Sequence, residues 1–419
     1  CWLKPLLLKP FCFKNCAAAP GLHNWSMSPR ASLALLAALL CASCGASSSG
    51  SGCPQQTCDG DGSGLIQLRM SQGDQRPAAG PPAGVYVIGG NGPTAAGPAA
   101  LSANVFFLAA PGGTWAAMPN LTYPRAGLAA AHYGGLLYAI GGFSGSALPG
   151  VSLDLVEAFD GAAWSLAPAM KIARRYFAVV VYACPPKVVP AWRPDADCLY
   201  AIGGGPNNNS EIALSRSVEV FDGTAWRVLD RGMWLTTPRM QLGAAVHDGR
   251  IFAAGGVLPE GQPPPGADTC FDGEAGGVGV QAFRTIEVFN GERWQVLPNC
   301  RMPPHPCRGQ VALASLGPSL FFGGALQVST GVVDTLTIDD AGACMWGRPT
   351  NWSTPRSDAR MATFADRVFV AGGAGTRPLP TWLASVESLQ CSQSGQHERW
   401  GSIAPLPLGR AIPAVAAVL

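Results

Sequence analysis

The sequence predicts an all-β fold, a six-bladed β-propeller in which each blade has four short antiparallel strands. The hexapeptide "LYAIGG" occurs twice, from Leu137 and from Leu199. Related apolar segments that end in Gly-Gly recur along the chain, and the six begin at Val85, Leu137, Leu199, Ile251, Leu320 and Val368. A spacing of about 50 residues is typical of propeller blades. The 53 Gly and 37 Pro residues agree with many turns between short strands.

Each repeat predicts the same elements in the same order. The Gly-Gly segment is rich in apolar, β-branched and aromatic residues, which favour a strand, and the glycine pair indicates positive φ or close backbone approach. A second strand follows, as in "LVEAFD", "SVEVFD" and "TIEVFN", and then a turn and one tryptophan. These tryptophans are Trp115, Trp164, Trp226, Trp294, Trp346 and Trp400. The next segment is often introduced by Pro-Arg, as in "TPRMQLGAAVHDG", and supplies a further strand.

The two ends of the repeat region predict how the ring closes. The first repeat begins directly with its Gly-Gly strand at Val85, and no Arg-led strand comes before it. The chain ends with an Arg-led strand, "RAIPAVAAVL", that has no Gly-Gly strand after it. We therefore predict that the C-terminal strand pairs with the N-terminal blade, which removes the open sheet edges that promote aggregation.

These repeats resemble the kelch family over residues 85–419. The resemblance is carried by the Gly-Gly strand, the Glu-aromatic-Asp strand, the spaced tryptophan and the Arg-led strand. It implies one four-stranded blade per repeat, with the Arg-led strands facing a central channel and the loops before them contributing to a binding face. The fifth repeat departs most, because "DTLTIDD" lacks the Glu and the aromatic residue. The first repeat lacks the acidic pair.

The N-terminal part predicts targeting and not folded structure. We assign residues 1–26 to a leader extension or non-native sequence, 27–44 to a signal peptide, 45–84 to a Gly/Ser/Pro-rich linker and 85–419 to the propeller. The apolar run "LALLAALLCA" from Leu33 is too short to span a bilayer. We expect a secreted or extracellular protein without a transmembrane segment. A lipid anchor at Cys44 and an organelle are the alternatives.

Cysteine usage agrees with export, because nine cysteines follow the leader. We predict a disulfide between Cys184 and Cys198, which flank an expanded hairpin loop. Cys300 with Cys307 is a weaker second pair, and Cys53 with Cys58 and Cys344 with Cys391 are guesses that leave Cys270 unassigned. Zinc bound by Cys300, His305 and Cys307, with Cys270 nearby, is the less favoured alternative. Sequons predict glycans at Asn120, Asn208 and Asn351.

Charge and short motifs narrow the function. Four basic residues precede the first acid, Asp59, so the remaining 24 of 28 basic residues face 26 acidic ones. A body this close to neutral argues against a nucleic-acid partner. "DGDGSG" resembles a calcium loop through Asp59, Asp61 and Ser63, but Met70 stands where a bidentate Glu belongs, so we prefer a solvated linker. We expect no cofactor.

Six recurrent arginines are the candidate ligand-binding residues. Each lies ahead of an expected channel strand, and they are Arg125, Arg174 (or its neighbour Arg175), Arg239, Arg308, Arg356 and Arg410. An arginine there can bind carboxylates or phosphates in a bidentate manner. The competing interpretation, which we favour, is that it holds the backbone and the acids of its own repeat.

Two function classes remain. The first is a secreted module, expected to be monomeric, that binds a protein or glycan through its loops. The second is an extracytoplasmic carbohydrate-active enzyme that resembles six-bladed kelch sugar epimerases or, less well, the seven-bladed copper galactose oxidases. We find no HExxH, GxSxG or Walker motif, which favours the binding module. The long segments Val257 to Phe283 and Pro298 to Pro306 predict that one wall of the ligand site lies on the fourth blade.

Overall fold

The computed structural model describes residues 80–94, 97–145, 150–186, 188, 196–205, 215–258, 267–273, 279–326, 329–339, 342–375, 381–390 and 399–419. The chain falls into two compact units, Cys1–Gln72 and Gly73–Leu419, and every described residue belongs to the second. The expected signal peptide and calcium loop, together with Cys53, Cys58, Cys391 and Asn208, lie outside the described residues.

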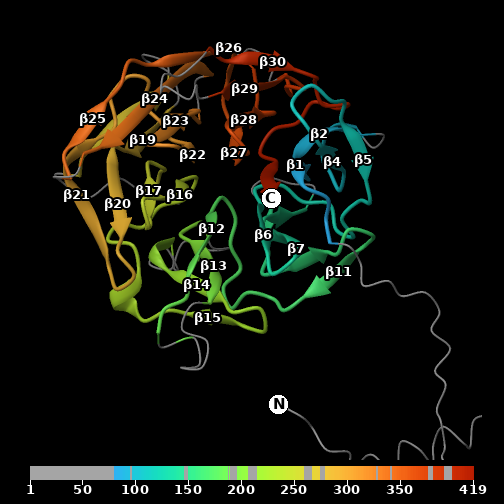
Figure 1. Cartoon of the computed structure of the whole chain (residues 1–419), viewed down its shortest axis with the longest axis horizontal. Coiled ribbons are helices and arrows are strands. Elements are labelled where there is room, and N and C mark those ends of the chain that lie inside the picture. The colour runs from blue at the N-terminus through green and yellow to red at the C-terminus, as the bar shows by residue number, and fades with distance from the viewer. Residues whose placement is uncertain are drawn as a thin grey trace, which may run out of the picture. The chain divides into compact units, whose positions relative to one another are not determined.

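Six antiparallel sheets stand in a ring, as predicted (Figure 1). From the inside outward, blade 1 contains β31 (Ala414–Val418), β1 (Gly84–Ile88), β4 (Val105–Leu108) and β5 (Ala116–Met118). Blade 2 contains β6 (Ala129–Tyr133), β7 (Leu136–Ile140), β10 (Val156–Phe159) and β11 (Trp164–Ala167). Blade 3 contains β12 (Ala178–Ala183), β13 (Asp197–Ile202), β14 (Val218–Phe221) and β15 (Trp226–Val228).

The second half of the ring repeats this order. Blade 4 contains β16 (Gly243–His247), β17 (Arg250–Ala254), β20 (Thr285–Phe289) and β21 (Trp294–Arg301). Blade 5 contains β22 (Ala312–Leu316), β23 (Ser319–Gly323), β24 (Thr330–Ile338) and β25 (Cys344–Trp346), and β26 (Thr350–Arg356) pairs with β24 as a fifth strand. Blade 6 contains β27 (Arg360–Phe364), β28 (Arg367–Ala371), β29 (Val386–Gln390) and β30 (Gly401–Ile403).

The ring is closed by the C-terminal strand. β31 pairs with β1 in antiparallel register from Gly84↔Val418 to Ile88↔Ala414, which confirms the predicted closure. Each innermost strand also contacts the innermost strands of the blades on both sides. Blade 1 is therefore built from both ends of the propeller unit.

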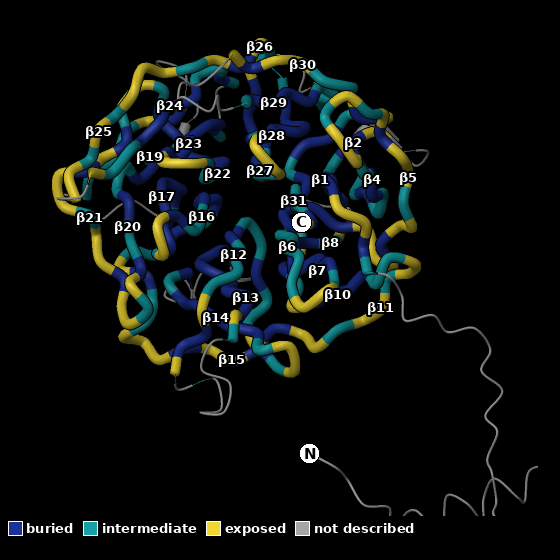
Figure 2. The backbone as a smooth tube through the Cα atoms, in the orientation of Figure 1, coloured by how far each residue is buried: buried dark blue, intermediate teal, exposed yellow. Residues whose placement is uncertain are grey.

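The core lies between the blades. The Gly-Gly strands are almost wholly buried, whereas most residues of the outermost strands are exposed or half-buried at the rim (Figure 2). One cluster joins Tyr200 and Val220 of blade 3 to Phe289 of blade 4, so neighbouring sheets share their apolar surfaces. Trp226 is 1% exposed and stacks on Phe221 of the same blade, with ring centroids 5.2 Å apart. It also belongs to one apolar cluster with Tyr138 and Ile140 of blade 2.

Backbone bridges place the Gly-Gly turns and the Arg-led segments together at one end of the ring, here called the loop face. In five blades the residue after the arginine pairs with the first residue beyond the glycine pair, as in Met240↔Val257 and Ser357↔Ala374. The glycines are required: Gly203 and Gly204 have φ of 67° and 96°, and a Cβ on Gly204 would lie 2.6 Å from Cβ of Phe177.

Among the described residues, three hairpins follow Gly-Gly turns on this face. They are β2–β3 (Asn91–Thr94 and Gly97–Leu101), β8–β9 (Phe143–Ser144 and Val151–Ser152) and β18–β19 (Thr269–Gly273 and Gly279–Phe283). The last lies in blade 4, within the long segment that the sequence marked for the ligand site.

Candidate functional site: the mouth of the central channel

The six recurrent arginines are buried, with exposures of 0 to 1%, and five of them pair with an acid on the third strand of their own blade. The Nη to carboxylate distances are 2.7 Å for Arg174–Glu219, Arg239–Glu287 and Arg308–Asp334, and 2.8 Å for Arg356–Glu387; Arg125 pairs with Glu157 in the same way.

The pairs are part of a larger hydrogen-bond network that holds each blade together. In blade 4, Arg239 Nη1 donates to the carbonyl of Gly255 at 2.8 Å. Glu287 accepts the backbone N–H groups of Thr236 and Thr237 at 2.6 and 3.3 Å. One ion pair thus ties the Arg-led segment, the Gly-Gly turn and the third strand together. The favoured interpretation, that these arginines hold their own repeats, is confirmed, and ligand binding by them stays a prediction.

The two divergent repeats keep the arginine by different means. In blade 5, Asp334 of "DTLTIDD" pairs with Arg308 in place of the missing glutamate. In blade 1, Phe106 occupies the glutamate position, and the Arg410 guanidinium lies 4.5 Å from the centroid of its ring. Arg410 Nη1 donates to the carbonyl of Gly89 at 2.9 Å, and burial lowers the pKa of Arg410 to about 10.

Three disulfides are present among the described cysteines. Cys184–Cys198 is confirmed, with a Cα–Cα distance of 4.9 Å. The predicted pair Cys300–Cys307 is wrong, and so is Cys344–Cys391, because the bonds are Cys270–Cys307 and Cys300–Cys344. The physical reason is that β21 continues as far as Arg301, so that Cys300 lies buried against Cys344 on the outer edge of blade 5. Because the three candidate cysteine ligands Cys270, Cys300 and Cys307 all form disulfides, the zinc alternative is removed.

The hairpin β18–β19 is fastened to blade 5 at the loop face. Cys270 on β18 is bonded to Cys307, next to Arg308. Asp272, 2% exposed, accepts the backbone N–H groups of Gly309 and Leu326 through Oδ2, at 2.6 and 2.8 Å. The hairpin therefore has a defined position, while the Phe271 side chain between these anchors is 46% exposed.

The channel mouth is framed by a ring of left-handed residues. In five blades the residue two positions after the arginine has a φ between 52° and 62°. Tyr176 N–H donates to Gly127 and Gln241 N–H to Tyr176, so the blades are linked around the mouth. Blade 5 differs, because the N–H group that donates to the carbonyl of Gln241 belongs to Val311. In the other blades the corresponding residue lies two positions after the arginine, which in blade 5 would be Gln310. The five residues are Gly127, Tyr176, Gln241, Asp358 and Ile412.

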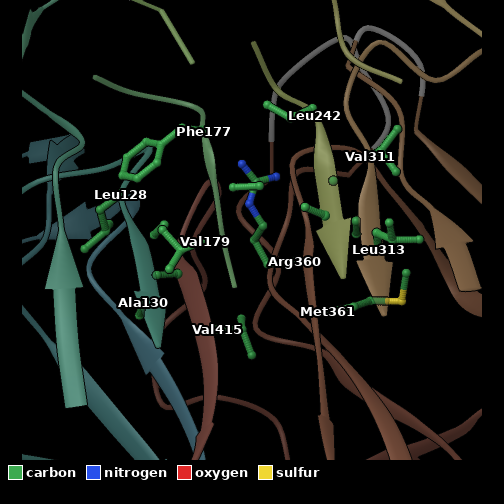
Figure 3. Close-up of a pocket in the computed structure, with 16 residues that line it drawn as sticks. Leu128, Ala130, Phe177, Val179, Leu242, Val311, Leu313, Arg360, Met361 and Val415 are labelled. Carbon is green, nitrogen blue, oxygen red and sulfur yellow. The ribbon is translucent and has the colours of Figure 1, made fainter. Parts of the chain in front are cut away.

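Below this ring the innermost strands enclose a cavity of about 80 Å³ (Figure 3). Apolar side chains such as Phe177, Val179 and Leu313 surround it, and Arg360 is the one charged residue that lines it in the described part of the chain. Arg360 begins β27, where register places small residues in the other blades: Ala129, Ala178, Gly243, Ala312 and Ala414.

Two ring residues are electrostatically coupled to Arg360. Burial raises the pKa of Asp358 to about 7; the Arg360 charge opposes this increase and Asp272 adds to it. Burial also raises the pKa of Tyr176 to about 12, with a further contribution from Asp358. Our sequence reasoning missed all three residues. The available signal was a basic residue in "DARMATF" where the other Arg-led strands have alanine or glycine.

Of the remaining predicted positions, Asn120 and Asn351 are exposed. No cluster of three or more potential metal ligands occurs among the residues that the structure describes. Within the same residues, no helix has the length and apolar character to cross a membrane.

The ring of six sheets, each with its buried arginine at the loop face, defines a six-bladed β-propeller built from one recurring motif. The family model of the kelch motif matches residues 124–171, which include Arg125 and all four strands of blade 2. With that motif repeated around the ring, the chain is a kelch-repeat β-propeller. A search of curated proteins found no match.

Proposed function

We propose that this protein is a secreted binding module that takes a protein or glycan partner on its loop face. The kelch propeller supports a protein-binding role in general. The observation that carries the proposal is the hairpin β18–β19, which a disulfide and two Asp272 hydrogen bonds hold in place beside the channel mouth. A rigid hairpin with an exposed aromatic residue suits recognition, because little ordering entropy is lost on binding.

Secretion is supported by the three disulfides, since such bonds persist mainly in oxidising compartments. The apolar run from Leu33 and the exposed sequons at Asn120 and Asn351 agree with this route. The six blades argue against the resemblance to the copper oxidases, which implies seven.

The proposal is tested by screening the purified, oxidised protein against a glycan array and a panel of purified extracellular proteins. For any ligand found, affinity is compared for wild type, Phe271→Ser and Leu166→Ser. Leu166, on outermost strand β11, is 64% exposed and serves as the matched control. We expect Phe271→Ser to weaken binding at least tenfold and Leu166→Ser to leave it unchanged. Equal affinities for all three folded proteins would contradict the placement of the site.

A further inference from the structure

We infer that the channel holds a binding site for a small monovalent anion of carboxylate size, formed by Arg360 at the loop-face end of the cavity. This inference goes beyond the proposed function and does not depend on the loop face having a partner. It rests on the contrast between Arg360 and the other arginines buried around the mouth.

Arg360 lacks the close ion pair that five of the recurrent arginines have, although it interacts electrostatically with Asp358. Five of those six form an ion pair within 4.0 Å, and Arg410 has backbone carbonyls and an aromatic face. Arg360 forms no such ion pair with the described residues, and its one hydrogen bond to them, from Nη1 to the carbonyl of Ala359, is 3.3 Å long. Its half-buried guanidinium therefore has unused donors that face the cavity.

Partial burial of the Arg360 charge without a close ion pair is unfavourable. Burial lowers the pKa of Arg360, and the cavity wall around it is apolar or backbone. A half-buried guanidinium is stabilised by an anion that accepts two parallel N–H bonds, the geometry of a carboxylate. The cavity of about 80 Å³ has room for a small anion.

Asp358 sets the pH dependence of this site. The charged and titratable groups that interact with it are Arg360 on its own segment, Tyr176 before β12 and Asp272 on β18. Arg175 interacts in turn with Tyr176 and lowers its pKa. When Asp358 is ionised, it competes with an exogenous anion for Arg360. Because burial raises its pKa to about 7, lowering the pH through neutrality removes that competing charge. Anion binding should therefore tighten as the pH falls.

The test compares thermal unfolding of wild type, Arg360→Met and Arg227→Met in increasing sodium acetate. Arg227 is 55% exposed and provides the matched charge-removal control. We expect the Tm of wild type and Arg227→Met to rise by roughly 2 °C at saturating acetate, more below neutral pH than above it. Arg360→Met should show no such rise. An equal acetate-dependent rise in Arg360→Met would overturn the inference.

A second measurement decides the matter if Arg360→Met does not fold. Wild-type crystals soaked in sodium bromide should show an anomalous peak within hydrogen-bonding distance of the Arg360 guanidinium. A map with bromide elsewhere on the protein and none at Arg360 would refute the site.

Discussion

At the scale of single residues, the buried arginine of each blade is stabilised by what surrounds it. A guanidinium at 0 to 1% exposure has lost its water, and the paired carboxylate and the glycine carbonyl replace it. The buried ion pair adds little net stability, but removal of one partner alone is strongly destabilising because the other charge stays buried.

Glu287→Ala should show this. The substitution leaves Arg239 charged and buried without its carboxylate, and frees the N–H groups of Thr236 and Thr237. We expect the free energy of unfolding to fall by about 3 to 5 kcal/mol, measured by denaturant titration. Arg227→Met, which breaks only the exposed pair with Asp222, should cost no more than about 1 kcal/mol. Similar losses of unfolding free energy in both variants would contradict a special dependence of buried Arg239 on its carboxylate.

Asp358→Asn tests the raised pKa at the mouth. Folding shifts the Asp358 pKa from about 4 to about 7, so the native state binds a proton that the unfolded chain releases in this window. This group therefore lowers stability progressively as the pH rises from about 4 to about 7. The Tm of Asp358→Asn relative to wild type should increase over that range and then level off. A difference independent of pH would show that Asp358 titrates normally.

At the scale of elements, the three disulfides lie in different regions of the propeller. Cys184–Cys198 joins β12 and β13 at the end opposite the loop face. Cys270–Cys307 fastens the hairpin to the loop face, and Cys300–Cys344 joins the outer edges of blades 4 and 5. Each bond can therefore be removed with a local and distinguishable effect.

The double variant Cys270→Ala/Cys307→Ala should loosen the hairpin selectively. We expect faster hydrogen exchange of the β18–β19 amides and a loss of stability of about 3 kcal/mol. The double variant Cys184→Ala/Cys198→Ala should lose a similar amount of stability, but hydrogen exchange of the hairpin amides should stay as in wild type. Unaltered hairpin exchange in the first variant would mean that the Asp272 hydrogen bonds suffice to hold it.

The elements also show where sequence reasoning succeeds. Cys184 and Cys198 were predictable because one hairpin connects them, so strand pairing alone brings them together. Cys300 and Cys344 lie on different blades, and their contact depends on how far β21 extends and how adjacent sheets pack. No local pattern in the sequence carries that information. The same holds for Arg360, which becomes conspicuous only when the register of all six innermost strands is known.

At the scale of the whole molecule, the architecture was predictable because it is repeated. The six Gly-Gly segments recur at a regular spacing and together identify the blades. The first repeat lacks an Arg-led strand and the chain ends with an unpaired one, which predicts closure by β31. The contents of the channel were not predictable, since they depend on residues that the repeat leaves free to vary.

Removal of β31 tests the closure. A chain truncated after Ile412 would expose the paired edge of β1 and would remove Ala414, Ala416 and Val418 from the apolar cluster between blades 1 and 2. We expect loss of the cooperative unfolding transition and aggregation on size-exclusion chromatography. A monomeric truncated protein with the Tm of wild type would show that the ring does not need the strand.

The ring of left-handed residues at the mouth has a consequence for engineering. Its hydrogen bonds between blades are made by main-chain N–H and carbonyl groups, so these bonds do not depend on the side chains of Tyr176, Gln241 and Asp358. A combinatorial library at these three positions would vary the chemistry of the opening while leaving the interblade hydrogen bonds in place. Asn and Gly, which tolerate positive φ best, would be the least strained choices in such a library. The propeller would then serve as a scaffold for selecting new ligand specificities.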